Sequence, residues 1–432
     1  MVACGSRTSP IVPDGSLPFD ARVADAVVAR DVQPDDVPLV LPDCGVAVGS
    51  GGVRFRVRDV VGRTAIDDEG NLYAPTRTAN EGRGLVSLDP CGRERWRVTA
   101  LPGSATRQYQ GGAARLTSGG DVLLTDVTGD ATARTIFRYD TDGNLRTPYV
   151  IPSPYVRFIG APVGRGPLVA TSSTTLANQL DAFDLAGRHT LHVDNWSNVN
   201  ECAITGNILA CLDHALDLDT GRVLWGSDNF EIIDGTLRHA LPPAIDTERG
   251  RIYVAMFGIS SYLLVAHDLA TGREIFRTTL ATSNQGQRGL LMGAPVIDNH
   301  GVVYVYVNVS SVAGDGGHLY AVTPEGARSS FWAATSTRQD FTHTATHLLG
   351  RGGQMYFAVA NALERINVAG GGGWHLSIPE GVNDPELALS TNGNLAVHTD
   401  DDQLLVVVTD SPGNLDSPWP APGGSAHNAN AR

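Results

Sequence analysis

Two histidines four residues apart, His343 and His347, form the pattern in this chain that most resembles a metal site. Side chains alternate between the two faces of a β-strand, so residues i and i+4 share a face and both imidazoles would point the same way. The pattern lacks the glutamate of an HExxH zinc motif, and no third ligand is evident. We therefore favour a turn that leads into a strand, with metal binding as the alternative.

An acidic segment, Asp140-Thr141-Asp142-Gly143-Asn144, loosely resembles the start of a calcium-binding loop. The twelfth position of such a loop needs a bidentate glutamate, and here it is Ile151. Aspartate and glycine are also the residues that a tight turn between two strands requires, and we favour that interpretation. The sequence thus predicts no catalytic, cofactor-binding or metal-binding residue.

One pair of the five cysteines, Cys202 and Cys211, lies at a spacing that suits a disulfide. Gly206-Asn207 predicts a two-residue hairpin turn, and counting outward from it places the two cysteines opposite each other. Their position is a non-hydrogen-bonded pair with Cα atoms ~4.5 Å apart, the short end of what a disulfide accepts. Two reduced, buried thiols are the alternative.

The other three cysteines concern the N-terminal region. Elimination pairs Cys44 with Cys91, which would tie that region to the first repeat. Met1-Val2-Ala3-Cys4 resembles the end of a bacterial lipoprotein signal, whose cysteine receives the lipid, and a chance cysteine is the alternative. Residues 5–42 are rich in Pro, Asp, Ser and Gly, so residues 1–42 are predicted to be a lipid-anchored flexible tether.

Composition narrows the class of protein. The formal net charge of −14 argues against binding to a nucleic-acid backbone or to an anionic lipid surface, because both need a basic face. All 32 Lys and Arg residues are arginine, which excludes chemistry that depends on a lysine amine. No run of 18 apolar residues is present, and 49 Gly with 24 Pro fit an all-β chain rich in turns.

A repeated unit organises the chain, and its best copy spans residues 241–279. Its β-branched and aromatic runs between Gly-bearing turns predict four strands that are apolar on both faces. Such a sheet is soluble only if similar sheets cover both faces. Further copies begin at 37- to 54-residue spacings, the range of a four-stranded propeller blade. The eight starts are Arg63, Gly112, Ile159, Asn200, Leu237, Gly289, His343 and Asp384.

The last copy lacks a convincing fourth strand, and a spare strand precedes the first copy at residues 52–59. We predict that this N-terminal strand completes the last blade, because closure removes the exposed sheet edges. The predicted fold is therefore an all-β, eight-bladed β-propeller over residues 43–416, built of four-stranded antiparallel blades. Seven blades are the alternative.

The turns carry a family resemblance. Ala215 to Trp225 matches the motif AxDxxTGxxxW at every fixed position, and so the chain resembles the pyrroloquinoline-quinone-like (PQQ-like) propeller repeat. The tail, residues 417–432, resembles the WPxFGGxxxN segment of such chains but has Pro422 where the family has an aromatic. It is predicted to pack on the propeller or to trail from it. The aromatics at the motif position, predicted to pack between blades rather than to stack on sugars, are Phe55, Trp96, Trp225, Phe276, Trp332 and Trp374.

The resemblance implies two possible functions. The enzymatic branch of the family binds the quinone and a calcium ion at the ring centre, often beneath two adjacent cysteines, and this chain has no Cys-Cys dipeptide. The chain looks more like the scaffold branch, typified by the propeller lipoprotein of the outer-membrane β-barrel assembly machine. We therefore predict a monomeric, non-catalytic bacterial protein, periplasmic or anchored at the outer membrane, which holds a protein partner without any cofactor. A PQQ-dependent dehydrogenase and a carbohydrate-binding module are the alternatives.

Overall fold

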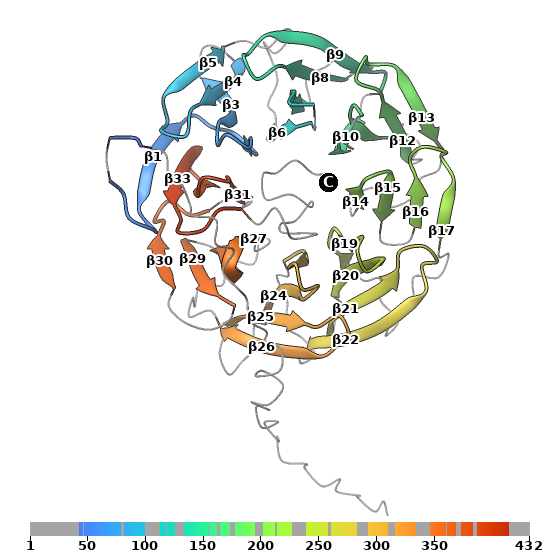
Figure 1. Ribbon diagram of the computed structural model, residues 1–432. Helices are drawn as coiled ribbons and strands as arrows, with labels where there is room; N and C mark the ends of the chain where they lie inside the picture. The colour runs from blue at the N-terminus through green and yellow to red at the C-terminus, as the bar shows by residue number, and fades with distance from the viewer. Residues whose placement is uncertain are drawn as a thin grey trace, which may run out of the picture.

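The computed structural model forms a ring of eight sheets, each of four antiparallel strands or, in one case, five (Figure 1). It describes residues 43–45, 47–78, 82–99, 113–117, 119–125, 134–153, 155–161, 165–172, 178–194, 202–211, 214–226, 239–257, 261–282, 293–309, 316–333, 346–359, 361–368, 373–382 and 387–413. Cys4, His343 and the tail 417–432 lie outside these residues.

The first four blades follow one another along the chain, and in each the strands pair in sequence order. Blade 1 is β2 (Ala65–Ile66), β3 (Leu72–Thr78), β4 (Gly82–Leu88) and β5 (Glu94–Val98). Blade 2 is β6 (Ala113–Leu116), β7 (Val122–Thr125), β8 (Arg134–Tyr139) and β9 (Leu145–Ile151). Blade 3 is β10 (Tyr155–Gly160), β11 (Leu168–Ser172), β12 (Asn178–Phe183) and β13 (His189–Val193). Blade 4 is β14 (Cys202–Thr205), β15 (Ile208–Cys211), β16 (His214–Asp217) and β17 (Val223–Gly226).

The remaining blades complete the circle. Blade 5 is β18 (His239–Ala240), β19 (Ala244–Asp246), β20 (Arg251–Phe257), β21 (Ser261–Asp268) and β22 (Glu274–Thr282), with β18 and β19 both paired to β20. Blade 6 is β23 (Val296–Ile297), β24 (Val303–Val309), β25 (Gly316–Val322) and β26 (Arg328–Ala333). Blade 7 is β27 (Thr346–Leu349), a 3-10 turn η2 (Arg351–Gly353), β28 (Gln354–Val359), β29 (Ala362–Asn367) and β30 (Trp374–Ser377). Blade 8 is β31 (Leu387–Leu389), β32 (Asn394–His398), β33 (Gln403–Val408) and β1 (Val53–Arg58).

Blade 8 joins the two ends of the described chain. β1 pairs antiparallel with β33, with Val53 opposite Val407 and Val57 opposite Leu404. Backbone bonds continue the pairing past the strand end, since the amide of Gly51 donates to the carbonyl of Val408 at 2.8 Å. The predicted closure by the N-terminal strand is confirmed, and the ring has eight blades rather than seven.

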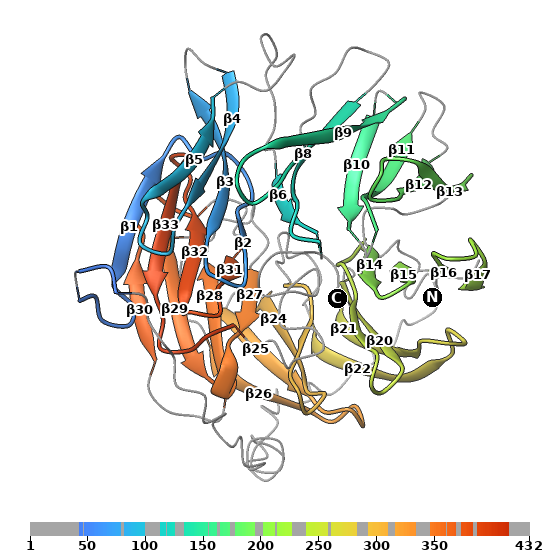
Figure 2. The ribbon, with the colours of Figure 1, turned by 45° about the horizontal axis from the view of Figure 1, so that its top comes forward.

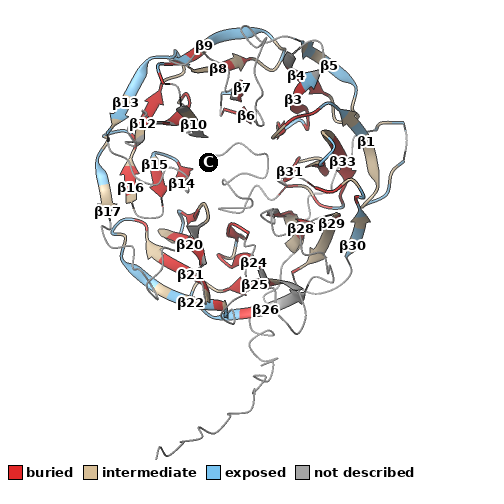
Figure 3. Cartoon of the chain, turned by 180° about the vertical axis from the view of Figure 1, so that it is seen from behind, coloured by how far each residue is buried: buried red, intermediate tan, exposed pale blue. Residues whose placement is uncertain are grey.

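Apolar residues on both faces of each blade bury against the neighbouring blades. The largest core cluster contains Ala203 of blade 4, Tyr253 and Leu264 of blade 5 and Val305 of blade 6. The view tilted by 45° shows the sheets standing face to face around a shared axis (Figure 2). Burial falls from the inner strands to the outermost strand of each blade (Figure 3). The outermost strands therefore form a solvent-exposed rim around the ring. This pattern explains why the strands are apolar on both sides.

Neighbouring blades are also joined by a contact that recurs at the rim. The outermost strand of one blade presents a large side chain to the glycine of the turn between the last two strands of the next blade. The contacting pairs are Phe55 with Gly92, Trp96 with Gly143, Tyr149 with Gly187, Leu191 with Gly221, Trp225 with Gly272, and Phe276 with Gly326. In blade 8, whose last two strands are not joined by a turn, Trp374 of blade 7 instead meets Gly51, just before β1. Trp332 lies on β26 opposite Leu319, and its side chain is outside the described part.

A hydrogen bond fixes several of these rings. The indole Nε1 of Trp225 donates to the carbonyl of Leu269 at 2.9 Å, and that of Trp96 donates to the carbonyl of Thr141 at 2.7 Å. Gly272 has φ +69°, and a Cβ added there would lie 2.6 Å from the Trp225 ring. The glycine of the motif is therefore needed both for its left-handed backbone and for the space that the ring occupies.

We expect Gly272→Ala to destabilise the protein more than Gly250→Ala. Gly250 has a similar φ of +61°, but among the described residues no atom lies within 4 Å of the added Cβ, so its substitution carries only the backbone cost of about 1 kcal/mol. Gly272→Ala adds a clash with the Trp225 ring, for a further cost of about 1–3 kcal/mol. Urea unfolding of both variants measures the difference. Equal midpoints would contradict the proposed role of the ring contact.

Candidate functional site

The disulfide between Cys202 and Cys211 forms as predicted. The two residues face each other across the β14–β15 hairpin, with Cα atoms 4.0 Å apart. The register counted outward from Gly206-Asn207 is the observed one, since Thr205 pairs with Ile208. The bond lies across the two inner strands of blade 4, so it fixes that hairpin locally.

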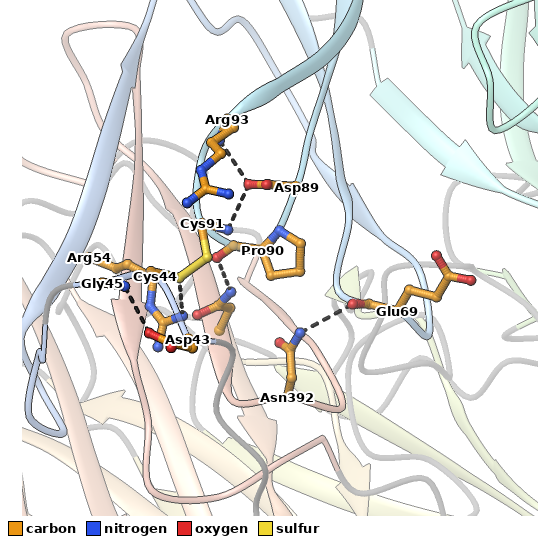
Figure 4. Close-up of a disulfide and its surroundings, with 11 residues drawn as sticks. Asp43, Cys44, Gly45, Arg54, Glu69, Asp89, Pro90, Cys91, Arg93 and Asn392 are labelled. Carbon is orange, nitrogen blue, oxygen red and sulfur yellow. Dashed lines mark hydrogen bonds between the residues drawn. A yellow bond between two sulfur atoms is a disulfide. The ribbon is translucent and has the colours of Figure 1, made fainter.

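The second predicted disulfide, Cys44–Cys91, joins the segment before β1 to a turn of blade 1 (Figure 4). The Cα atoms are 5.3 Å apart, and the two cysteines stand 47 positions apart in the sequence. The amide of Cys91 donates to Asp89 Oδ1 at 2.9 Å, which orders the turn around the bond. This disulfide therefore links blade 1 to the strand that completes blade 8.

Polar contacts also join blades 8 and 1 at the seam, the place where the two ends of the ring meet. Asn394 Nδ2 donates to the carbonyl of Pro90 at 2.9 Å, and Asn392 Nδ2 donates to the carbonyl of Glu69 at 3.2 Å. A further bond of 2.8 Å joins His398 Nε2 to the carbonyl of Val60. Side chains of blade 8 thus bond backbone carbonyl groups of blade 1.

His347, one member of the histidine pair considered for metal binding, is fully buried on β27. Its Nε2 lies 3.2 Å from the carbonyl of Tyr304, and its ring stacks on Phe357. Within the described residues its Nδ1 has no hydrogen-bond partner. Desolvation lowers the pKa of His347 to about 4, so the imidazole is neutral at pH 7 and packs as a core residue.

Burial of His347 predicts a loss of stability in acid. The unfolded chain takes up a proton near pH 6.5, whereas the folded protein does so near pH 4, so stability falls as the pH drops between these values. The loss approaches about 3 kcal/mol when complete. Urea unfolding at pH 7 and pH 4.5 measures it, and His347→Gln is expected to lose less stability than the wild type over that interval. Identical losses in the two proteins would contradict this assignment.

The acidic segment at Asp140 is a turn between β8 and β9. Asp140 Oδ1 accepts from the amides of Asp142 and Asn144 at 3.1 and 2.8 Å, and Oδ2 pairs with Arg146 at 3.2 Å. These hydrogen bonds, chiefly that from the Asn144 amide, lower the pKa of Asp140. The carboxylate is therefore occupied in shaping the turn, which agrees with the interpretation favoured from the sequence.

The sequence also predicts that two longer inter-strand loops, Thr76 to Gly84 and Val309 to Gly317, form the binding surface, and the first of these is shorter in the structure. β3 continues to Thr78 and pairs with β4 from Gly82, so that hairpin extends almost to its tip. The prediction missed this because Gly82 and Gly84 stand where β-branched residues were sought, and sheet pairing overrides a weak local propensity. The second loop lies where it was predicted, since β24 ends at Val309, opposite Gly316 of β25.

A cluster that the sequence analysis did not find lies on the outer half of blade 3. Asp181 Oδ1 lies 2.8 Å from His189 Nε2 and 2.7 Å from His192 Nδ1. Asp181 is only 9% exposed, whereas the two histidine side chains are 46% and 41% exposed. The hydrogen bond to Asp181, and a further one to Asp194, raise the pKa of His192. Among the described residues these three side chains form a group with metal-ligating atoms within 4.8 Å of one another.

A β-bulge brings the two histidines to one face. Asp181 pairs with His192, and Phe183 pairs with His189, so the register between β12 and β13 shifts by one residue. In a regular strand His189 and His192 would point to opposite faces, because three positions separate them. A similar bulge recurs between β4 and β5 and between β21 and β22. Alignment of the third repeat with these two could therefore have placed both histidines on one face.

No protein-family model matches the chain, and no curated protein matches it. Solved structures do. The propeller of Dos1 aligns with a TM-score of 0.53 and 8% identity, over 82% of this chain and 93% of that one. The chain is an eight-bladed β-propeller. The WD40 domain of SCAP from fission yeast aligns at a TM-score of 0.49 and 10% identity, over 83% and 97% of the two chains. Dihydro-heme d1 dehydrogenase NirN aligns at 0.48 and 13%, over 75% and 67%.

These similarities concern the fold alone, because every identity lies far below 25%. The described part of this propeller also contains no helix long and apolar enough to span a bilayer.

Proposed function

We propose that this protein is a non-catalytic scaffold of the bacterial cell envelope, which holds a protein partner outside the cytoplasm. The observation that carries the proposal is the pair of disulfides, Cys44–Cys91 and Cys202–Cys211, on a closed propeller. Structural disulfides persist in oxidising compartments and are rare in the cytosol of mesophiles. The lipid anchor at Cys4, a monomeric state and membership of the scaffold branch of the PQQ-like family belong to the same proposal.

The rigid architecture of the propeller suits the presentation of a binding surface. Each blade is held by its neighbours on both faces, and the seam is joined by strand pairing and a disulfide, so loops and hairpins are presented on a rigid frame. The β3–β4 hairpin extends one strand pair to Thr78 and Gly82, and the Arg77 side chain there is 58% exposed. A net charge of −14 disfavours binding to nucleic acids and to anionic lipids through repulsion between like charges. Proteins remain suitable partners.

Site-specific crosslinking in envelopes tests the proposal. We would place a photo-crosslinking residue at Arg77 and, as a matched control, at Val150, which is 60% exposed on the rim strand β9. The expected result is one discrete protein crosslinked from Arg77, absent from Val150 and lost from co-purification when Arg77→Glu is introduced. No discrete product from Arg77, or equal products from both positions, would contradict a specific partner at this hairpin.

Two further measurements address compartment and catalysis. Thiol alkylation of the exported protein should label none of the four disulfide cysteines, and it should label Cys4 only where that residue carries no lipid. Cys4→Ser should release the protein from membranes. Four free thiols among Cys44, Cys91, Cys202 and Cys211 in cells would overturn the extracytoplasmic assignment. Dye reduction after addition of quinone and calcium, above the level of heat-denatured protein, would overturn the non-catalytic assignment.

A further inference from the structure

We propose that Asp181, His189 and His192 bind a divalent transition-metal ion of the zinc class. The proposal does not depend on the scaffold function, because it rests on the geometry of blade 3 alone. Two imidazole nitrogens and a carboxylate oxygen are donors that suit zinc, and three protein ligands leave a fourth position for water. That position faces solvent, since both histidine side chains are nearly half exposed.

The donor atoms are close to the separation that a metal requires. A tetrahedral zinc ion with bonds of about 2.0–2.1 Å holds its donors about 3.3 Å apart. The nitrogens of His189 and His192 now lie 2.8 and 2.7 Å from Asp181 Oδ1, so the donors must spread by about half an ångström to admit the ion. The exposed imidazoles have the freedom to make this shift, and the buried carboxylate provides the fixed point.

Neighbouring side chains orient these ligands for a metal ion. Thr171 Oγ1 donates to Asp181 Oδ2 at 2.9 Å, which orients the carboxylate and leaves Oδ1 for the ion. His192 Nε2 lies 3.1 Å from Asp194 Oδ1, which also accepts from Gln179 Nε2 at 2.9 Å. The ion would displace the proton that His192 Nδ1 shares with Asp181, while the proton on Nε2 stays donated to Asp194. Carboxylate partners of this kind orient metal-binding histidines and raise their basicity.

The other blades provide an internal comparison. In blades 1 and 5 the positions of the two histidines hold a Glu–Arg ion pair, at 2.8 and 2.6 Å, and the position of Asp181 holds valine. Blade 3 departs from this pattern at all three positions together, which a single surface ion pair does not require. The counterparts are Val86, Glu94 and Arg97 in blade 1, and Val265, Glu274 and Arg277 in blade 5.

Blade 7 supplies a control with two ligands only. Glu364 lies opposite His375, as Asp181 lies opposite His192, and the closest ion-pair atoms are 3.5 Å apart. The position that corresponds to His189, two residues before Trp374, is a glycine in the sequence. This pair therefore has the same cross-strand pairing as Asp181 and His192, and glycine offers no side-chain donor at the third position.

Titration of the full chain with zinc tests the proposal. The protein carries Cys4→Ser, which removes the one cysteine outside the two disulfides, has no histidine tag and is stripped with a chelator before calorimetry. The expected result is one saturable Zn²⁺ site per chain, and Co²⁺ added in its place should give the visible absorption of a four-coordinate site. Absence of saturable Zn²⁺ binding would overturn the proposal and leave the cluster as a hydrogen-bonded histidine pair.

The decisive variant replaces the three ligands with their blade 5 counterparts, Asp181→Val, His189→Glu and His192→Arg. It is expected to fold, because blade 5 tolerates these residues in the same strand register, and to lose the site. Asp194→Asn should weaken Zn²⁺ binding about ten- to hundredfold while keeping the Co²⁺ spectrum. His375→Ala should change neither.

A single substitution keeps the test informative if the triple variant misfolds. His189→Gln alters one exposed ligand and should likewise abolish one-to-one binding, with folding checked by circular dichroism. Undiminished Zn²⁺ binding in this variant, or an equal loss in His375→Ala, would assign the metal elsewhere and overturn the proposal.

Discussion

The pairing of β1 with β33 is the constraint on which the rest of the ring depends. Eight sheets that are apolar on both faces are soluble only if each has a neighbour on either side, and the last neighbour of blade 8 is blade 1. The chain meets this need by placing its first described strand at the outer edge of its last blade. The Cys44–Cys91 disulfide and the bond from Asn394 to Pro90 then hold the seam from two directions.

Local patterns predicted most of this fold. The strands expected from the unit at 241–279 appear within a few residues of β19 to β22, and the hairpin at Gly206-Asn207 predicted a disulfide that the structure contains. The blade 3 cluster was not predictable in the same way. Its histidines share a face only because the register slips by one residue beside Phe183, and a spacing of three otherwise separates side chains in a strand.

Comparison of the blades with one another shows where one blade differs from the others. At the rim, most blades present an aromatic ring to the turn glycine of the next blade, whereas blade 3 presents Leu191. The same blade replaces a valine and a Glu–Arg pair with Asp181, His189 and His192. Residues that most blades share hold the ring together, and residues particular to one blade are free to serve a separate purpose. At all three positions of the cluster, blade 3 differs from blades 1 and 5.

Hydrogen exchange tests the central claim about closure most directly. The comparison is between Cys44→Ala/Cys91→Ala and the same protein lacking residues 1–58, so that both lack the disulfide and only one lacks β1. If closure holds the ring together, deletion should lower amide protection in all eight blades, including β21 of blade 5, far from the seam. Loss of protection confined to β32 and β33, with the other blades unchanged, would contradict the account.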